Sequence, residues 1–380
     1  MSFADIRYQP AAVRMLRAAV AGDRVPHAYL FVGPRGVGKG LAARQLAKLL
    51  FCASPRGKDA DGPDPCDACD PCRRVDRDVH PDLHWFRKEP DRNDFRIELV
   101  ARREGSPSAV VTESVMLTPM EAERTVTVLD DAELLNRAAA SALLKTLEEP
   151  SSRAVLILLC ADASRLPGTI LSRCQWVRFG PLPEEFVATK VREVLAARSA
   201  PRAGDGKARA PQPDVSAEEI AFVCRFAGGS IEQAADLAGS GLWDLKRDFI
   251  GHLPALDAGT ALDMAEAVKA WGQAVAKREH VRWDTPEGNA VRRRTARLAL
   301  AAVASAFGDA ALLAAGIDGA RLVNADQRRV LEALSAWPTE ASARAVGLLA
   351  DGQAQIGRYV HTELAAENAL IQVSRLRPSM

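Results

Sequence analysis

A glycine-rich segment near the start of the chain has the residue types of a phosphate-binding loop. It reads Gly33-Pro-Arg-Gly-Val-Gly-Lys39-Gly40, follows a short apolar stretch and precedes a helical pattern, which is the setting in which such a loop binds phosphates. Backbone N–H groups and a helix N-terminus would hold the phosphates, and Lys39 would reach the terminal ones. The candidate nucleotide-binding residues are Gly33, Gly36, Gly38, Lys39 and Gly40.

Position 40 carries glycine where an active loop carries Ser or Thr. The hydroxyl of that residue normally holds the magnesium ion of the nucleotide, so Gly40 argues against productive binding of ATP with magnesium. Two interpretations stay open: a nucleotide site with weakened metal binding, and a loop that only turns the chain.

An acidic cluster, Asp130-Asp131-Ala-Glu133, follows a second apolar stretch. At the end of a strand, Asp130 would coordinate magnesium through water, and Asp131 would polarise the attacking water. Because Asp131 replaces the usual glutamate, we interpret Asp130 and Asp131 as degenerate catalytic acids of the Walker B type. The alternative is an acidic cluster that interacts favourably with a helix N-terminus.

Four cysteines lie in one short segment rich in proline and aspartate: Cys52, Cys66, Cys69 and Cys72. Four thiolates, three of them in C-x-x-C-x-x-C spacing, suit a closed tetrahedral zinc site, which would be structural because no coordination position stays open. The alternative is four buried free cysteines, with His80 and His84 as further ligand candidates. We expect a zinc module at about residues 52–85.

Arg173 lies in the sequence Ser172-Arg-Cys174. An arginine in such a place is most often a surface or salt-bridged residue. In a chain that also carries a phosphate loop and Walker B acids, Arg173 is a candidate catalytic residue, an arginine finger inserted in trans to stabilise charge on a neighbouring subunit's γ-phosphate.

Strands alternating with helices must position these residues. Apolar, β-branched runs predict strands of a parallel sheet buried on both faces, with helices between them, which indicates an α/β domain. Breakers at Gly180-Pro-Leu-Pro183 mark its end. The expected strands are Ala28–Val32, Thr125–Leu129, Ala154–Leu159 and Gln175–Phe179, and with less support Phe95–Val100 and Ala109–Leu117 around a turn at Glu104–Ser108.

The second half of the chain has helical patterns only. We expect an α/β domain over 1–180, a helical subdomain over 181–240 and a second helical domain over 241–380, with a linker at Ser199–Pro213 and a break at Asp284–Gly288. The apolar faces at Ala296–Ala304 and Leu331–Ala345 suit either the unit's own core or an interface. The run Arg292-Arg-Arg294 indicates a solvated helix face rather than a DNA-binding site.

Composition narrows the class of protein. Fifty Lys and Arg against 49 Asp and Glu leave a net charge of +1, which excludes a strong overall electrostatic attraction to nucleic acid. We find no apolar run that approaches the roughly 18 residues of a membrane span, and no signal peptide at the start. A cytoplasmic protein is expected, in which clustered cysteines bind metal and do not form disulfides.

Taken together, the motifs resemble the bacterial clamp-loader subunits of the AAA+ family, over roughly the first half of the chain. The residues that carry the resemblance are His27–Gly33, the cysteine module, His80-Pro-Asp82, the stretch from Asn136 through Ala142-Leu-Leu-Lys-Thr-Leu-Glu-Glu-Pro150, and Ser172-Arg-Cys174. The resemblance implies a RecA-like α/β module, a helical lid and a helical collar through which five subunits assemble.

Two departures distinguish the types of subunit. An ATPase of the tau/gamma type would keep the hydroxyl lost at Gly40 and a sensor arginine after Gly228-Gly-Ser230, where this chain has Ile231-Glu-Gln-Ala234. This pattern is similar to that of the delta-prime family. It implies tau/gamma and delta as partners, contact with the sliding clamp and primed DNA through the assembly, Arg173 acting in trans and little or no ATPase activity of its own. A tau/gamma-like motor and a zinc-stabilised scaffold are the alternatives.

Overall fold

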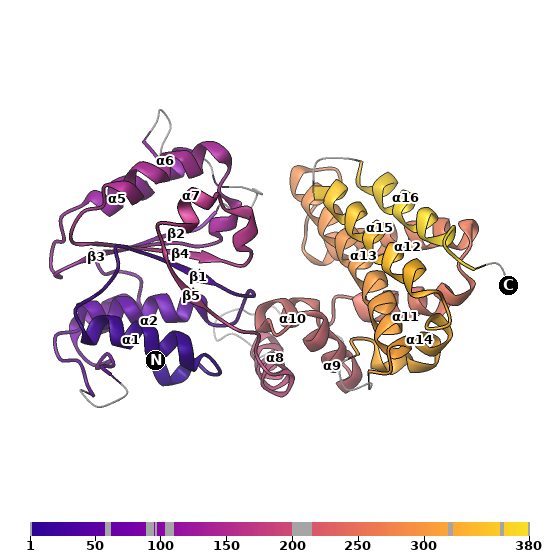
Figure 1. The fold of residues 1–380 in the computed structure, drawn as a ribbon, viewed down its shortest axis with the longest axis horizontal. Helices are drawn as coiled ribbons and strands as arrows, with labels where there is room; N and C mark the ends of the chain where they lie inside the picture. The colour runs from indigo at the N-terminus through magenta and orange to yellow at the C-terminus, as the bar shows by residue number, and fades with distance from the viewer. Residues whose placement is uncertain are drawn as a thin grey trace, which may run out of the picture. The chain divides into compact units, whose positions relative to one another are not determined.

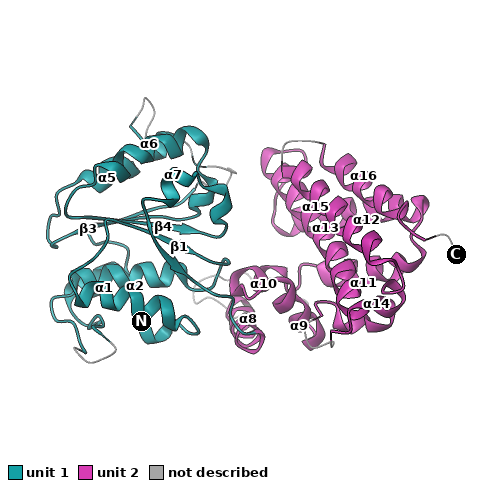
Figure 2. Ribbon diagram, viewed as in Figure 1, with its two compact units in different colours: residues 1–183 teal, residues 184–380 magenta. Residues whose placement is uncertain are grey.

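The computed structural model describes residues 2–57, 62–88, 95, 97–102, 110–199, 215–317, 322–357 and 361–378. The chain forms two compact units, Met1–Pro183 and Glu184–Met380 (Figures 1 and 2). Each unit is described by itself below.

A five-stranded parallel sheet organises the first unit, in the order β2-β3-β4-β1-β5. Its central strands are buried along their whole length because helices cover both faces, so most of their side chains are apolar; Thr125 and Thr127 are buried polar exceptions. The strands are β1 (Ala28–Val32), β2 (Leu83–Phe86), β3 (Thr125–Leu129), β4 (Ala154–Cys160) and β5 (Gln175–Arg178).

Helices lie on both sides of this sheet. Figure 1 shows α1 and α2 along one face and α5, α6 and α7 along the other. Leu143 of α6 and Leu156 and Leu158 of β4 belong to the core on the second face and are at most 1% exposed. The helical elements are η1 (Phe3–Asp5), α1 (Pro10–Ala21), α2 (Lys39–Phe51), α3 (Asp70–Asp76), α4 (Ile97–Val100), α5 (Val111–Met116), η2 (Ala132–Leu134), α6 (Arg137–Glu148), η3 (Ala163–Arg165) and α7 (Gly168–Leu171).

The strands expected at Phe95–Val100 and Ala109–Leu117 are wrong. Within these segments α4 and α5 are helical, and Phe95 forms only an isolated bridge to Leu135. Val111, Ser114 and Val115 are buried at helical spacing, so packing of α5 against the sheet overrides the β-branched composition. The turn expected at 104–108 lies outside the described residues. The edge strand β2 was not expected.

The second unit is helical throughout its described residues. Polar N-caps start several of its helices: Ser216, Ser230, Asp257 and Thr285 each accept a backbone N–H of the first turn. The fold class, an α/β module followed by helical structure, is confirmed. The helices are α8 (Glu184–Ser199), α9 (Ala217–Phe226), α10 (Ile231–Leu237), α11 (Leu242–His252), η4 (Leu253–Ala255), α12 (Ala258–Arg278), α13 (Pro286–Ala314), η6 (Ala325–Gln327), α14 (Arg328–Leu334), α15 (Thr339–Gly357) and α16 (Thr362–Ser374).

Helix α13 is the core helix of this unit. It contains an 18-residue window with a mean hydropathy of 1.5, long and apolar enough to cross a membrane, although no such run was expected. Half of that window is buried, as in the core helix of a globular unit, and this makes it weak evidence for a membrane span. Its apolar face, with Ala296, Leu300 and Val303 buried, serves the unit's own core. The linker expected at 199–213 lies outside the described residues except for Ser199, which ends α8.

Candidate functional site

The glycine-rich loop connects β1 to α2 at the carboxyl edge of the sheet. Gly33 meets the backbone of Phe179, whose carbonyl oxygen would be 2.3 Å from any Cβ placed there, so only glycine fits. Gly36 and Gly38 have φ angles of +70° and +102°, a region that side chains disfavour. Gly38 is also the N-cap residue of α2.

Lys39 turns back into this loop. Its Nζ donates hydrogen bonds to the carbonyl oxygens of Gly33 and Pro34 at 2.6 and 2.7 Å, and the residue is 8% exposed. Burial lowers the pKa of Lys39, while the nearby carboxylates of Glu133 and Asp130 act in the opposite direction. The sheet therefore brings the loop lysine and the acidic cluster after β3 into one neighbourhood.

The acids of that cluster each have a protein partner. Asp130 Oδ2 lies 3.5 Å from Arg87 Nε, and Asp131 Oδ1 accepts from Arg35 at 2.6 Å. Glu133 is buried and accepts the backbone N–H of Ala161 at 3.2 Å. Asp131 is the N-cap residue of η2, with φ of +55°, and burial raises its pKa. Both candidate Walker B acids therefore face guanidinium groups.

A groove of about 570 Å³ adjoins the loop at Gly40. Three of its lining residues, Arg44, Trp85 and Arg87, were not expected from the sequence. The guanidinium carbons of Arg44 and Arg87 each lie 5.2 Å from the centre of the Trp85 ring. The sequence offers only a weak signal for these residues, the aromatic residues of Leu83-His-Trp-Phe86 followed directly by arginine, which is too short to predict a strand.

The four cysteines of the predicted metal site come together. All four sulfur atoms lie within 4.8 Å of one another, and those of Cys52 and Cys69 are 3.9 Å apart. Zinc bound tetrahedrally at about 2.3 Å from each sulfur requires sulfurs separated by about 3.8 Å. This donor set therefore fits a closed zinc site.

The local backbone prepares one of these thiols, that of Cys66, for a cation, whereas burial raises the pKa of Cys52 and of Cys72. Burial raises the pKa of Cys66, but N–H groups of Ala68 and Cys69 outweigh it and lower the pKa to about 6. Cys66 Sγ accepts the backbone N–H of Cys69, and Cys52 Sγ accepts that of Cys66. His80 does not join the cluster: its ring stacks on Phe51 with centroids 4.3 Å apart.

Ion pairs attach the cysteine segment to helix α2. Lys48 is fully buried and forms ion pairs with Asp67, between the cysteines, and with Asp76 of α3. Arg44 donates to Val75 O and to Asp78, both at 2.6 Å. The module is therefore anchored to the same helix that carries the phosphate loop at its start.

Arg173 occupies a different place. It precedes β5, whereas the phosphate loop follows β1, and because these strands are parallel the two sites lie at opposite edges of the sheet. Its guanidinium donates to Thr169 O at 3.0 Å and pairs with Glu148 Oε1 at 2.8 Å, and its side chain is 36% exposed. The structure thus does not bring Arg173 to the chain's own phosphate loop.

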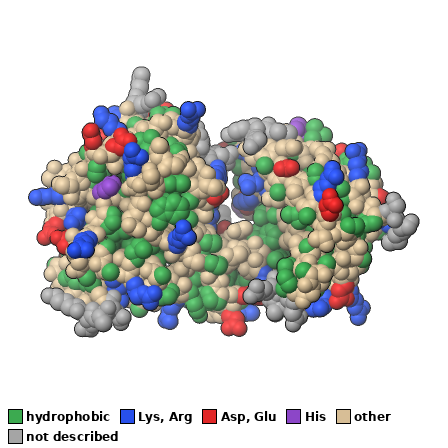
Figure 3. Space-filling model, viewed as in Figure 1, with side chains coloured by type: hydrophobic (Ala, Val, Ile, Leu, Met, Phe, Trp, Pro, Cys, Tyr) green, Lys and Arg blue, Asp and Glu red, His purple; other side chains and the backbone are tan. Residues whose placement is uncertain are grey.

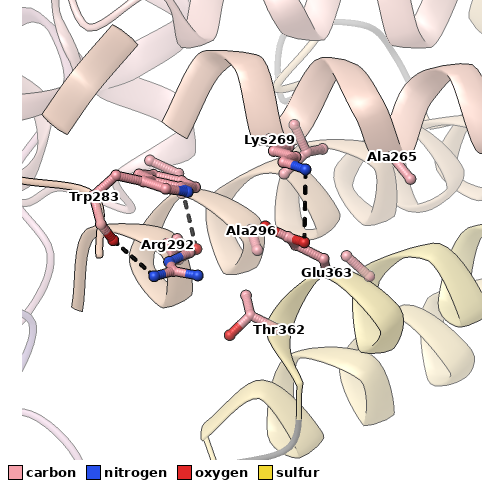
Figure 4. Close-up of a pocket in the computed structure, with 10 residues that line it drawn as sticks. Ala265, Lys269, Trp283, Arg292, Ala296, Thr362 and Glu363 are labelled. Carbon is pink, nitrogen blue, oxygen red and sulfur yellow. Dashed lines mark hydrogen bonds and ion pairs between the residues drawn. The ribbon is translucent and has the colours of Figure 1, made fainter. Parts of the chain in front are cut away.

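The arginines singled out in the second unit differ in their surroundings, and Arg292 packs against an aromatic ring. Arg292 lies 4.8 Å from the centre of the Trp283 ring and donates to Trp283 O, as Figure 4 shows. The cavity beside them measures about 10 Å³, room for one water and no ligand. The predicted solvated helix face is correct for Arg294, which is exposed and pairs with Glu279. It is not correct for Arg292. Charges of both signs are interspersed on the face drawn in Figure 3.

Known proteins are similar to about half of this chain. Residues 8–183 match the family model described as DNA polymerase III, delta subunit. The chain is 32% identical over 185 residues to the delta-prime subunit of Bacillus subtilis, covering 49% of this chain and 51% of that protein. It is 33% identical over 216 residues to the delta-prime subunit of Pseudomonas aeruginosa, covering 57% of each.

A subunit of the other type is also similar. The tau subunit of Escherichia coli is 33% identical over 194 residues, which cover 51% of this chain and 28% of that protein. The chain thus spans about half the length of its delta-prime relatives and less of the tau relative. Residues 8–183, which match the model of the DNA polymerase III delta-subunit family, span nearly the whole α/β unit.

Proposed function

We propose that this chain is a delta-prime-type subunit of a bacterial clamp loader. It assembles with tau/gamma and delta subunits in the cytoplasm, at the replisome, and helps to load the sliding clamp onto primed DNA. The family match and the delta-prime relatives support the type of subunit. In this function the chain supplies Arg173 to the nucleotide site of a neighbouring subunit.

The position of Arg173 carries this proposal. An exposed guanidinium at the sheet edge opposite the chain's own loop can reach only another molecule's phosphate. Its ion pair with Glu148 is half-exposed, and such pairs contribute about 0–1 kcal/mol. Exchanging that carboxylate for a γ-phosphate therefore costs little, and Thr169 O holds the side chain near its present place.

The chain's own ATPase activity is expected to be weak or absent. Gly40 provides no hydroxyl for magnesium, and Asp130 and Asp131 are paired with arginines. The rival function is a tau/gamma-like motor. It is favoured by the retained Lys39 and by the similarity to tau, which is as high as that to delta-prime.

The remaining parts have supporting roles in this proposal. Cys52, Cys66, Cys69 and Cys72 hold a structural zinc ion, which cross-links the end of α2 to α3 and supplies no reaction chemistry. Residues 181–240 form a lid subdomain, and residues 241–380 form a collar through which subunits assemble. DNA polymerase activity belongs to the complete assembly.

The test uses a reconstituted loader with clamp and primed DNA. We expect Arg173→Ala to lower the DNA-stimulated ATPase rate of the assembly by about 1000-fold at the affected site, the usual cost of losing an arginine finger. Arg178→Ala removes an exposed arginine from the neighbouring strand β5 and is the matched control. Size-exclusion chromatography checks that both variants assemble.

Each result decides between the alternatives. Full assembly with an unchanged ATPase rate in Arg173→Ala contradicts the trans-acting function and favours a scaffold. Steady ATP turnover by the isolated wild-type chain favours the motor. The delta-prime function is supported if the isolated wild-type chain does not turn over ATP and if the assembly loses ATPase activity with Arg173→Ala but not with Arg178→Ala.

A further inference from the structure

The corner of the phosphate loop beside Gly40 contains aromatic and cationic groups. A Cβ added at Gly40 would lie 3.7 Å from Cζ2 of Trp85 and 3.9 Å from Leu159. The side of α2 where a loop hydroxyl would project therefore faces the indole ring. Trp85 lines the adjoining groove, and its indole N–H is buried without a partner among the described residues.

Two guanidinium groups flank this indole. Arg87, next along the chain from β2, has its Nε 3.5 Å from Asp130 Oδ2. Arg44, on the second turn of α2, is fixed by Val75 O and Asp78. Both lie over the Trp85 ring. The acid that would hold magnesium in an active loop thus has a cation beside it already.

Magnesium does not fit this donor set. The ion prefers near-octahedral oxygen coordination and is usually held by one or two carboxylates, phosphates and waters. Here the hydroxyl is missing, the remaining acid Asp130 pairs with Arg87, and the groove presents a second guanidinium from Arg44. A dication in this corner would be repelled by both arginines.

The same groups suit an anion. Guanidinium binds phosphate oxygens through several N–H donors, and Arg87 has a 62% exposed side chain that can turn toward the groove. Lys39 can exchange the carbonyl oxygens of Gly33 and Pro34 for phosphate oxygens.

We propose that the phosphate loop of this chain binds the pyrophosphate group of a nucleoside di- or triphosphate without a divalent cation. Arg87 supplies the positive charge that magnesium supplies elsewhere, and Trp85 closes the corner. The ligand is held and not hydrolysed. This inference concerns the chain's own loop and goes beyond the function of Arg173 in trans, so either can fail alone.

The test measures binding to the isolated full chain by isothermal titration calorimetry. Pyrophosphate, ADP and ATP are each titrated in EDTA and in excess magnesium, which also separates recognition of the pyrophosphate from recognition of the nucleoside. We expect equal Kd values, within about 2-fold, in both buffers. Arg87→Ala should weaken binding at least 10-fold, whereas Arg102→Ala, which removes an arginine paired with Glu113 on α5, should not change it.

Three results would overturn the inference. The first is that magnesium strengthens binding 10-fold or more. The second is that none of the three ligands binds in EDTA, and the third is that Arg87→Ala binds as tightly as the wild type. A Trp85→Phe variant provides an independent readout. The change in tryptophan fluorescence on binding should disappear with this variant, and its persistence would place the ligand away from the proposed corner.

Discussion

Replacing Cys72 by serine tests the zinc module most directly. Cys72 is fully buried, and its sulfur lies within 4.8 Å of the other three. Loss of one thiolate opens the site and should release the metal. The long loop that zinc closes runs from Cys52 to Cys66 and spans 15 residues.

The loss of stability expected for Cys72→Ser follows from the entropy of closing this loop. Cross-linking a loop of about 15 residues removes about 10 cal/mol/K of entropy from the unfolded chain, or about 3 kcal/mol at 25 °C. The three cysteines from Cys66 to Cys72 are close in sequence and add little by this route. For a domain of this size, about 3 kcal/mol corresponds to a Tm lower by about 6–12 °C.

The assay combines metal analysis with thermal unfolding of the full chain. We expect one equivalent of zinc in the wild-type protein, less than a tenth of that in Cys72→Ser, and the same fall in Tm when the wild type is treated with a chelator. Cys224→Ala removes a buried thiol from the second unit and should retain the zinc. Metal-free wild-type protein with unchanged Tm, or a Cys72 variant that keeps its zinc, would refute the reasoning.

Three further substitutions test the packing. Burial opposes ionisation of Asp82, but the backbone N–H groups of 120–122 outweigh it and hold its pKa below that of an ordinary aspartate. The stabilisation from Asp82 is therefore present above the pKa of an unfolded aspartate, about 4, and is lost as the pH falls further. Asp82→Asn should lower the unfolding free energy by about 2 kcal/mol at pH 7 and flatten that acid dependence, as measured by urea unfolding. Leu143→Ala should cost about 3 kcal/mol in the same assay because it leaves a cavity in the core. Lys246→Met should cost about 3 kcal/mol because it leaves Asp326 unpaired, and adding Asp326→Leu should recover part of it; no recovery would contradict the assignment.

The sequence alone determined the main strands and the glycine loop. The runs around Phe31, Val128 and Ile157 are mostly apolar and rich in aliphatic or β-branched residues because the strands are covered on both faces, so composition predicts them directly. Gly36 and Gly38 are required by their own backbone angles, a local property. Both features are local properties of the chain. They can therefore be recognised from the sequence without knowledge of the tertiary structure.

Short elements were beyond the reach of the sequence. Strand β2 has four residues, of which only Phe86 is buried, and it exists because β3 pairs with it. Conversely, the β-branched residues of α5 became helical because Val111 and Val115 pack against the sheet at helical spacing. In both cases distant contacts outweighed local preference.

The candidate sites divide in the same way. Residue types and spacing alone selected Cys52, Cys66, Cys69 and Cys72, since ligand chemistry depends on the side chains themselves. Only the tertiary structure decided that Arg173 lies at the sheet edge opposite the phosphate loop, because strand order and direction set the edges. The pairing of β2 with β3 brings Arg87 close to Asp130, which lies 43 residues later in the sequence. No local sequence pattern encodes this proximity.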